Sequence, residues 1–215
     1  SGAATDDGRL LSPVPDCDLT ITFGTPKPSH FLQPAAGHMG RLVIGDIGIE
    51  AQRVLHLIGC PTVGPPGPAD HKYKRGYVAV LAGEMPGASA LTASAAAKGG
   101  AGYVRLIGSV SGIPQAIVQG SGDLALLEDS RIGCIAAGPG LGRGEGARAL
   151  LGRLLQLAPP LVLDADALVL LDIGRLPQGT VLTPHAGDQP RGDRQQICHA
   201  GGLVHRGLSC SCSSC

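Results

Sequence analysis

Between residues 76 and 163 the sequence repeats one unit, which is a short apolar run, a glycine turn and a helical segment. The apolar runs predict strands at 77–82, 103–107, 132–137 and 161–163. The intervening segments predict helices at 88–98 and 145–157. Alternation of this kind favours parallel strands joined by helical crossovers. We therefore expect an α/β domain with a mostly parallel sheet flanked by helices, with ligands at the carboxyl ends of the strands.

The amino-acid composition agrees with an α/β fold and limits the kinds of molecule that the protein is expected to bind. Aromatic residues make up 2% of the chain and glycines number 34, so the core must use Ala, Val, Leu and Ile with close backbone approaches. The 17 basic residues balance the 17 acidic ones, which gives no electrostatic argument for a nucleic-acid partner. No apolar run reaches the ~18 residues of a membrane span, and no signal peptide is visible. We expect a small-molecule substrate, no membrane partner and a cytoplasmic location, and leave a homo-oligomer open.

The 215 residues suffice for one domain plus a piece of another. Residues 1–56 contain strand-like runs at 19–23 and 42–49 with little helix between them, and predict a fragment of a second α/β domain. Residues 57–70 are rich in proline and glycine and read as a linker. Residues 71–196 form the main domain. Residues 197–215 have no hydrophobic period and end in a Ser/Cys tract, so we expect them to be disordered.

The glycine-rich run from residue 138 to 142 lies between an expected strand and an expected helix. Backbone N–H groups of Gly138, Gly140 and Gly142 could therefore face a phosphate or pyrophosphate. A tight turn with no ligand is the plain alternative. A dinucleotide-binding oxidoreductase is a second alternative, because Asp164 follows at roughly the distance of a ribose carboxylate. The third glycine of that fingerprint would be residue 143, which is Arg143, so the oxidoreductase ranks second.

Two carboxylates and one histidine complete the candidate residues. Asp164 and Asp166 follow an expected strand and would share one side if that strand continued, where they could hold Mg²⁺ through water or tune a proton transfer. The alternative for Asp166 is a cap on the helix that follows. His185 lies in a polar loop after Pro184, where a lone histidine usually has a structural role.

Several motifs together carry a resemblance to a known family. Gly83-Glu84-Met85-Pro86-Gly87-Ala88, the run 138–142, Asp164-Ala165-Asp166 and Thr183-Pro184-His185 resemble the dehydratase domain of NAD(P)H-hydrate repair enzymes, a branch of the ribokinase-like superfamily. The similarity spans roughly residues 76–188. Upstream, residues 1–8, 18–24, 27–28 and 46–49 are similar to the end of the partner epimerase domain. The order, epimerase then dehydratase, is that of the bifunctional members.

The resemblance implies a reaction and a set of contacts. ADP or ATP, with Mg²⁺, phosphorylates the C6 hydroxyl of (6S)-NAD(P)H-hydrate, and loss of phosphate regenerates NAD(P)H. Ala88, His185 and the run 138–142 would contact the hydrate, with Asp164 and Asp166 beside it. Asp188 stands where the family has a glutamate. Ser1 matches an epimerase serine that binds K⁺, although we expect no intact potassium site here.

The segment after residue 196 departs from the family. The family continues with a Lys-Gly segment and a Gly-x-Gly-Asp turn that supplies nucleotide contacts and the catalytic aspartate, and neither occurs there. We interpret the tail as out-of-frame or otherwise aberrant and the dehydratase domain as incomplete at its C-terminus. The resulting expectation is weak dinucleotide binding with impaired or absent turnover, and a non-catalytic remnant is the third alternative.

Overall fold

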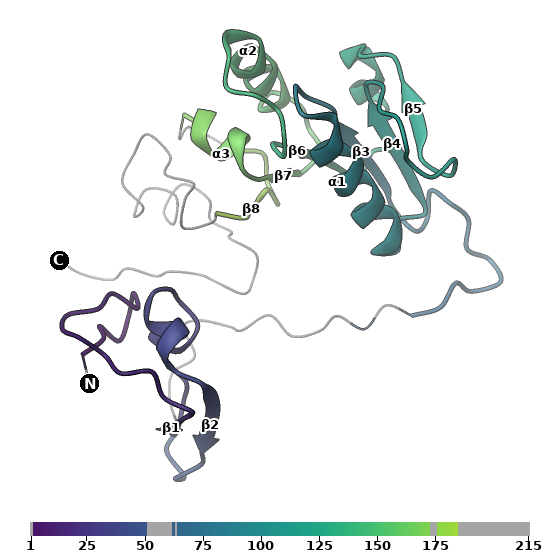
Figure 1. Ribbon diagram of the computed structural model, residues 1–215. Coiled ribbons are helices and arrows are strands. Elements are labelled where there is room, and N and C mark those ends of the chain that lie inside the picture. The colour runs from purple at the N-terminus through teal and green to yellow at the C-terminus, as the bar shows by residue number, and fades with distance from the viewer. Residues whose placement is uncertain (1, 51–61, 63, 173–175, 185–215) are drawn as a thin grey trace. The chain divides into compact units, whose positions relative to one another are not determined.

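The computed structural model describes residues 2–50, 62, 64–172 and 176–184 (Figure 1). The chain divides into two units, Ser1–Arg53 and Val54–Cys215. The first unit has a two-stranded sheet and the second has a six-stranded sheet. No helix in these residues has both the length and the apolar character needed to cross a membrane.

The first unit is built on two parallel strands, β1 (Leu19–Phe23) and β2 (Arg41–Gly45). Two short 3-10 helices, η1 (Pro28–His30) and η2 (Ala35–His38), lie between them in sequence. β1 has its expected bounds. β2 ends earlier than the expected residue 49, because the chain turns after Gly45 and the Asp46 carboxylate accepts the Gly48 N–H.

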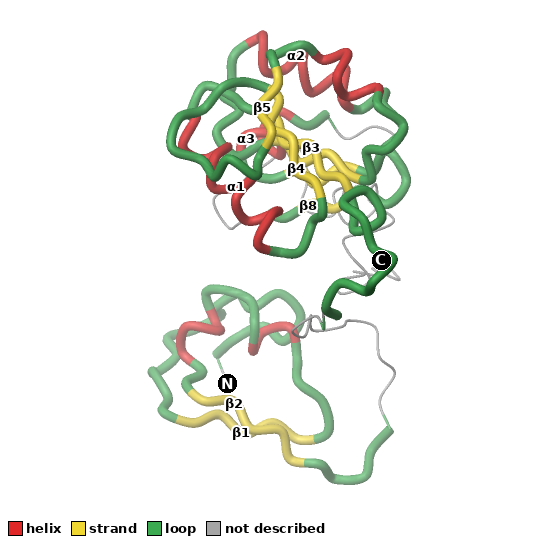
Figure 2. The backbone as a smooth tube through the Cα atoms, turned by 90° about the vertical axis from the view of Figure 1, so that its right-hand side faces the viewer, coloured by secondary structure: helices red, strands yellow, loops and turns green. Residues whose placement is uncertain are grey.

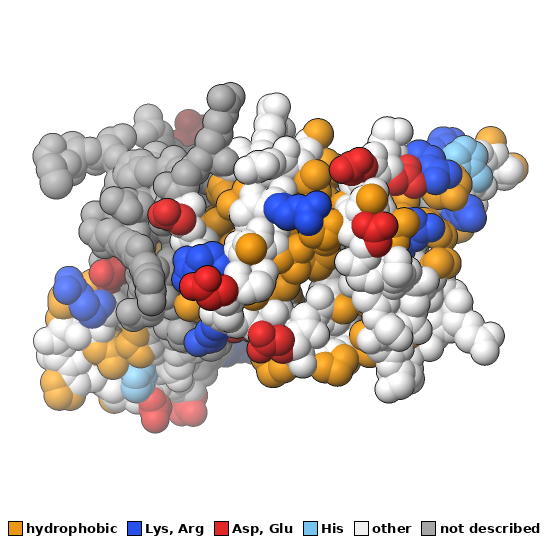
Figure 3. All heavy atoms as spheres, turned by 90° about the horizontal axis from the view of Figure 1, so that it is seen from above, with side chains coloured by type: hydrophobic (Ala, Val, Ile, Leu, Met, Phe, Trp, Pro, Cys, Tyr) orange, Lys and Arg blue, Asp and Glu red, His pale blue; other side chains and the backbone are white. Residues whose placement is uncertain are grey.

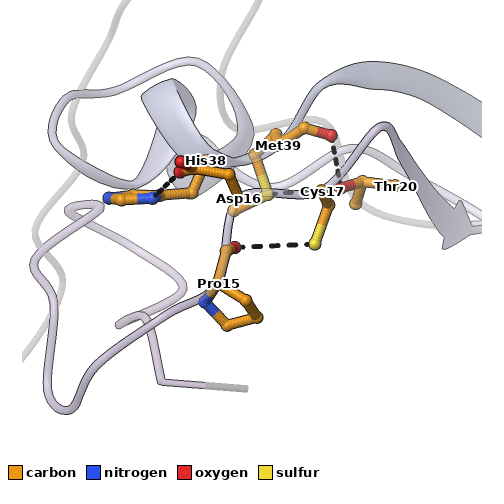
Figure 4. Close-up of polar contacts among 6 residues, drawn as sticks. All are labelled: Pro15, Asp16, Cys17, Thr20, His38 and Met39. Carbon is orange, nitrogen blue, oxygen red and sulfur yellow. Dashed lines mark hydrogen bonds and ion pairs between the residues drawn. The ribbon is translucent and has the colours of Figure 1, made fainter.

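Polar contacts fasten η2 to the chain around the start of β1 (Figure 4). The Thr20 hydroxyl donates to the Met39 carbonyl at 2.6 Å, and His38 Nδ1 lies 2.6 Å from the Asp16 carboxylate. Apolar packing contributes little, because the sheet leaves five large apolar side chains exposed: Leu19, Ile21, Phe23, Val43 and Ile44. A two-stranded sheet with this much exposed apolar surface buries no substantial core of its own.

The second unit has strand order β5-β4-β3-β6-β7-β8, and every neighbouring pair is parallel. Its strands are β3 (Tyr77–Leu81), β4 (Tyr103–Ile107), β5 (Val118–Gly120), β6 (Cys134–Ala137), β7 (Leu161–Leu163) and β8 (Val181–Leu182). Its helices are α1 (Pro86–Lys98), α2 (Glu145–Leu154) and α3 (Asp166–Leu170), with the 3-10 helix η3 (Leu124–Glu128). The predicted α/β class with a parallel sheet is confirmed.

Differences from the expected elements lie at their ends and at one edge of the sheet. α1 starts two residues early, at Pro86, because proline suits the first helical position. α2 stops at Leu154 instead of residue 157. β5 was not expected, since it is a three-residue edge strand whose Val118 and Gln119 are exposed and which therefore shows no apolar period.

The sheet is sandwiched between helical layers, with α1 and α2 on opposite sides (Figure 2). Side chains of β3 alternate between the two layers. Val80 packs in the cluster that includes Ala93 of α1, whereas Ala79 and Leu81 pack in the cluster that includes Leu151 of α2. Both faces of the central strands are thus buried, which is typical of a parallel sheet.

The strand order creates a switch point between β3 and β6. From β3 the chain builds outward to β4 and β5, then returns to the other side of β3 and builds β6, β7 and β8. Crevices for ligands in open α/β sheets form at the carboxyl ends of the strands where the order reverses. The loop 82–85 and the glycine-rich run 138–142 follow the two strands at this point.

Candidate functional site

The loops after β3 and β6 contact each other at the switch point. The Met85 N–H donates to the Gly140 carbonyl at 3.0 Å. A side chain at Gly83 would overlap the backbone of Gly140 and Leu141, and one at Gly140 would press on Ala88. The structure thus brings together Ala88 and the glycine-rich run, two segments singled out in the sequence.

The glycines of this run are required by the backbone. Gly138, Gly140 and Gly142 have φ values of 127°, 69° and 87°, which disfavour any side chain. Of the loop amides, Leu141 N–H donates to the Gly138 carbonyl at 2.9 Å. The N–H groups of Gly138, Gly140 and Arg143 have no hydrogen-bond partner among the described residues. These amides are the donors that the loop offers to a ligand.

Asp166 fixes the end of the glycine-rich run. Its carboxylate accepts the Gly142 N–H at 3.1 Å and lies 2.7 Å from Nε of Arg143. The Asp166 side chain is 8% exposed and that of Arg143 is 63% exposed, so the pair runs from the interior to the surface. The Gly142 amide is therefore occupied by a side chain and is not one of the donors available to an anion.

Asp164 and Asp166 do not share a strand face. β7 ends at Leu163, and Ala165 adopts a φ of 46°, which turns the chain into α3. Asp164 accepts the N–H of its neighbour Ala165 at 2.9 Å. Ala165 is the N-cap of α3 and no side chain caps that helix, so the alternative of Asp166 as a cap is wrong.

Charges of both signs surround these loops. The exposed Glu84 carboxylate lies where a side chain at Gly142 would be. Together with Asp164 and Asp166 it gives these loops three carboxylates, against the one cationic side chain of Arg143. Acidic and basic side chains also lie interspersed over the face seen in Figure 3. Because the charges of the described residues at these loops are of both signs, attraction for an anion would come mainly from the local amides. The described residues contain no group of three or more metal-binding side chains.

A cleft of about 410 Å³ opens at the carboxyl ends of β3 and β4, against α2. Its lining is mostly small or aliphatic: Leu81, Ala82, Ile107, Gly108, Gly122, Leu124, Gly146, Ala149, Leu150 and Arg153. Arg153 is the single charged residue of this lining. The cleft has the volume of a small-ligand site and borders the loop that leads into α2.

The remaining sequence candidates fall at the end of β8 or outside the described residues. Thr183 follows β8 and its N–H donates to the Leu163 carbonyl at 3.1 Å, so this segment starts at the same sheet edge. His185, Asp188 and Ser1 lie outside the described residues.

Two charged residues at this edge of the sheet, Arg143 and Asp123, were not predicted from the sequence as candidate site residues. Arg143 was noted only as the residue that spoils a dinucleotide fingerprint, and nothing in the sequence pairs it with Asp166. Asp123 completes a Gly-x-Gly-Asp tetrapeptide at residues 120–123, after β5. Its carboxylate accepts the Ala125 N–H at 2.9 Å and caps η3. The position differs from that of the family's turn, which follows the Thr-Pro-His segment.

Comparison with solved structures agrees with the architecture. A ribokinase-like superfamily protein from Enterococcus faecalis superimposes with a TM-score of 0.52 at 21% identity, over 66% of this chain and 56% of that protein. The ADP/ATP-dependent NAD(P)H-hydrate dehydratase from Bacillus subtilis, co-crystallised with ATP/Mg²⁺, is 26% identical over 59% of this chain and 50% of its own, with a TM-score of 0.48. The first of these comparisons shows that the second unit has a ribokinase-like α/β fold.

The sequence comparisons identify the family. Residues 78–191 match the family model described as NAD(P)H-hydrate dehydratase. The bifunctional NAD(P)H-hydrate repair enzyme Nnr of Thermanaerovibrio acidaminovorans is 36% identical over 209 residues, which cover 80% of this chain and 41% of that enzyme. The chain belongs to the NAD(P)H-hydrate dehydratase family, whose members are lyases. It spans about two fifths of the length of the curated relatives that it matches.

Proposed function

We propose that the chain derives from nicotinamide nucleotide repair, in the ADP/ATP-dependent dehydration of (6S)-NAD(P)H-hydrate to NAD(P)H, and that it binds the substrate with turnover impaired or absent. The observation that carries the proposal is the family match over residues 78–191, which includes every loop assembled at the switch point. Gly140 and Arg143 supply backbone donors for the anionic part of the substrate. Ala88 has a side chain small enough to let the substrate approach the start of α1.

Asp166 contributes to this site by holding the loop, and Asp164 lines the same edge. ADP or ATP would supply the phosphoryl group that turns the hydroxyl of the hydrate into a leaving group. Asp166 is already paired with Arg143, and the described residues contain no group of three or more side chains arranged to hold a metal ion, so they do not fit a Mg²⁺ site built from side chains alone. The proposal therefore assigns no step to a metal ion held by these residues. His185 remains proposed as a contact to the hydrate.

We further propose the domain division that the sequence suggests: an epimerase-like segment at 1–56, a linker at 57–70, the dehydratase-like domain at 71–196 and a tail at 197–215. Ser1 as a remnant K⁺ ligand belongs to the same proposal, as do a cytoplasmic location and the open possibility of a homo-oligomer. The dinucleotide oxidoreductase is disfavoured by the structure, because Arg143 occupies the position of the third glycine and pairs with Asp166.

Calorimetric titration of the full chain with NADPH-hydrate and with NADPH tests the proposal, and the absorbance of regenerated NADPH tests turnover. A full-length bifunctional repair enzyme serves as the positive control. We expect saturable binding of both ligands without turnover, because the segment after Asp188 lacks the family's Gly-x-Gly-Asp base. Absence of binding contradicts the proposed function. Robust turnover with ADP or ATP contradicts our interpretation of the tail.

A further inference from the structure

All three tyrosines of the chain meet at the amino ends of β3 and β4. Tyr77 and Tyr103 are the first residues of these strands, and Tyr73 lies in the turn that precedes β3. The ring centroids of Tyr77 and Tyr103 are 4.7 Å apart, and that of Tyr73 lies 6.1 and 5.5 Å from them. The loops of the candidate site follow the carboxyl ends of the strands, so this tyrosine cluster lies at the opposite edge of the sheet.

Three cationic side chains face the rings of the tyrosine cluster. Lys72 Nζ lies 5.0 Å from the ring centroid of Tyr73 and 4.9 Å from that of Tyr103. Arg131 Cζ lies 4.5 Å from the centroid of Tyr73, and Arg105 Cζ lies 5.8 Å from that of Tyr103. Ring faces attract cations but do not neutralise their charge. The cluster therefore gathers three positive charges.

The carboxylate beside these cations is already committed to one of them. Asp129 accepts from Nε of Arg131 at 2.8 Å and from its terminal nitrogen at 2.6 Å. These hydrogen bonds lower the pKa of Asp129 to about 2, so the carboxylate stays ionised and paired. Lys72 and Arg105 form no ion pair within the described part of the chain. The cluster thus keeps an excess of positive charge.

Two buried donors of the cluster need an acceptor that the described residues do not supply. The Tyr77 hydroxyl and Arg105 Nε are shielded from solvent, and neither has a hydrogen-bond partner among those residues. Tyr77 is 1% exposed, and burial raises its pKa, so its hydroxyl remains a donor at neutral pH. The Arg105 guanidinium donates to the Tyr103 hydroxyl at 3.2 Å, which leaves the proton of that hydroxyl able to donate as well. Buried donors left without an acceptor destabilise the fold.

We propose that the tyrosine cluster is a binding site for a small oxyanion such as inorganic phosphate. The oxygens of the anion accept from Tyr77 and Arg105, and its charge balances the excess of positive charge. A water molecule could accept the same bonds but would leave that charge uncompensated, which favours an anion. The anion must be small, because the donors lie within the packed cluster. Lys72 and Arg131 are exposed, so their long side chains can move aside to admit it.

The spectroscopy of the chain offers a direct assay for this site. The chain has no tryptophan, so its tyrosine fluorescence comes from the cluster alone. We expect a saturable change in this fluorescence, and a rise in melting temperature, when the full chain is titrated with sodium phosphate. Sodium chloride at the same ionic strength should produce neither change. Equal effects of the two salts would mean charge screening only and would overturn the proposal.

Matched variants locate the bound anion. Tyr77→Phe keeps the ring and removes the unpaired hydroxyl, so without phosphate it should melt no lower than the parent, and it should weaken phosphate binding about 10-fold. Lys72→Gln should weaken binding several-fold, whereas Arg148→Gln, which removes an exposed charge from α2, should leave it unchanged. Phosphate binding that neither Tyr77→Phe nor Lys72→Gln weakens overturns the proposal.

Competition with NADPH separates this site from the glycine-rich run. We expect phosphate to bind the tyrosine cluster with the same affinity whether or not NADPH is present, because the two sites lie at opposite edges of the sheet. Phosphate that NADPH displaces occupies the glycine-rich run, which overturns the proposal. The inference does not depend on the proposed function. A chain that binds phosphate at the cluster but binds neither NADPH nor its hydrate contradicts the proposed function alone.

Discussion

Removal of the Asp166 carboxylate should loosen the glycine-rich run by a predictable amount. In Asp166→Ala the Gly142 N–H loses its acceptor in a buried position, which costs about 1–3 kcal/mol. The ion pair with Arg143 adds up to about 1 kcal/mol, since the arginine is largely exposed and the pair is screened. We therefore expect Asp166→Ala to lower the free energy of unfolding of the second unit by about 1–4 kcal/mol.

Asp166→Asn divides this loss into its two parts. The amide oxygen of asparagine can still accept the Gly142 N–H, while the charge that attracts Arg143 is gone. The expected loss is about 1 kcal/mol or less. Asp164→Ala is the control, because the one bond of the Asp164 carboxylate within the described residues is from the adjacent Ala165 N–H, and it should cost no more than about 1 kcal/mol.

Tyrosine fluorescence during urea unfolding is a suitable assay. The chain has no tryptophan, and its three tyrosines, Tyr73, Tyr77 and Tyr103, all belong to the second unit, so the signal reports that unit. Equal losses for Asp166→Ala and Asp164→Ala would refute the reasoning. A loss as large for Asp166→Asn as for Asp166→Ala would show that the ion pair, and not the Gly142 bond, dominates.

Three other predictions concern the local surroundings of Gly138, Tyr77 and Cys134. Gly138→Ala should destabilise the second unit by about 2–4 kcal/mol, because the residue has a positive φ and an added side chain would overlap a backbone carbonyl. The control Gly87→Ala should be neutral or stabilising. Equal effects of the two substitutions in urea unfolding would contradict this prediction. Burial raises the pKa of Tyr77 above its ordinary value of 10.0. The contribution of Tyr77 to stability is therefore complete below that pH and falls as the pH rises through it. A melting temperature, followed by circular dichroism, that is no lower above pH 10 would contradict this prediction. Burial also raises the pKa of Cys134, while Cys17 is exposed, so site-resolved mass spectrometry should show slower alkylation of Cys134, and equal rates would count against the fold.

Three strands, β1, β4 and β7, have the bounds that the sequence predicted. β4 and β7 have their expected bounds, because continuous apolar runs between glycine turns leave little choice of structure. β5 escaped prediction because an exposed edge strand needs no apolar pattern. Chain order alone also does not reveal the switch point, which depends on β6 returning to the far side of β3.

The sequence predicted which residues take part in the candidate site, but it did not predict their contacts with one another. The glycines of the run 138–142 and the small Ala88 are visible in the sequence, and the structure brings Gly140 and Ala88 together. The role of Asp166 was not predictable, because its partners Gly142 and Arg143 lie 24 and 23 residues away on another loop. Such a contact depends on the turn at Ala165, which no local pattern signals.

Hydrogen–deuterium exchange of the full chain with and without saturating NADPH tests the central claim most directly, because it locates bound dinucleotide without requiring turnover. The account predicts slower exchange in peptides that cover residues 82–88 and 138–146, and no change in peptides that cover β1 and β2. Protection confined to the first unit, or no protection anywhere, would contradict the assignment of the switch point between β3 and β6 as the nucleotide site.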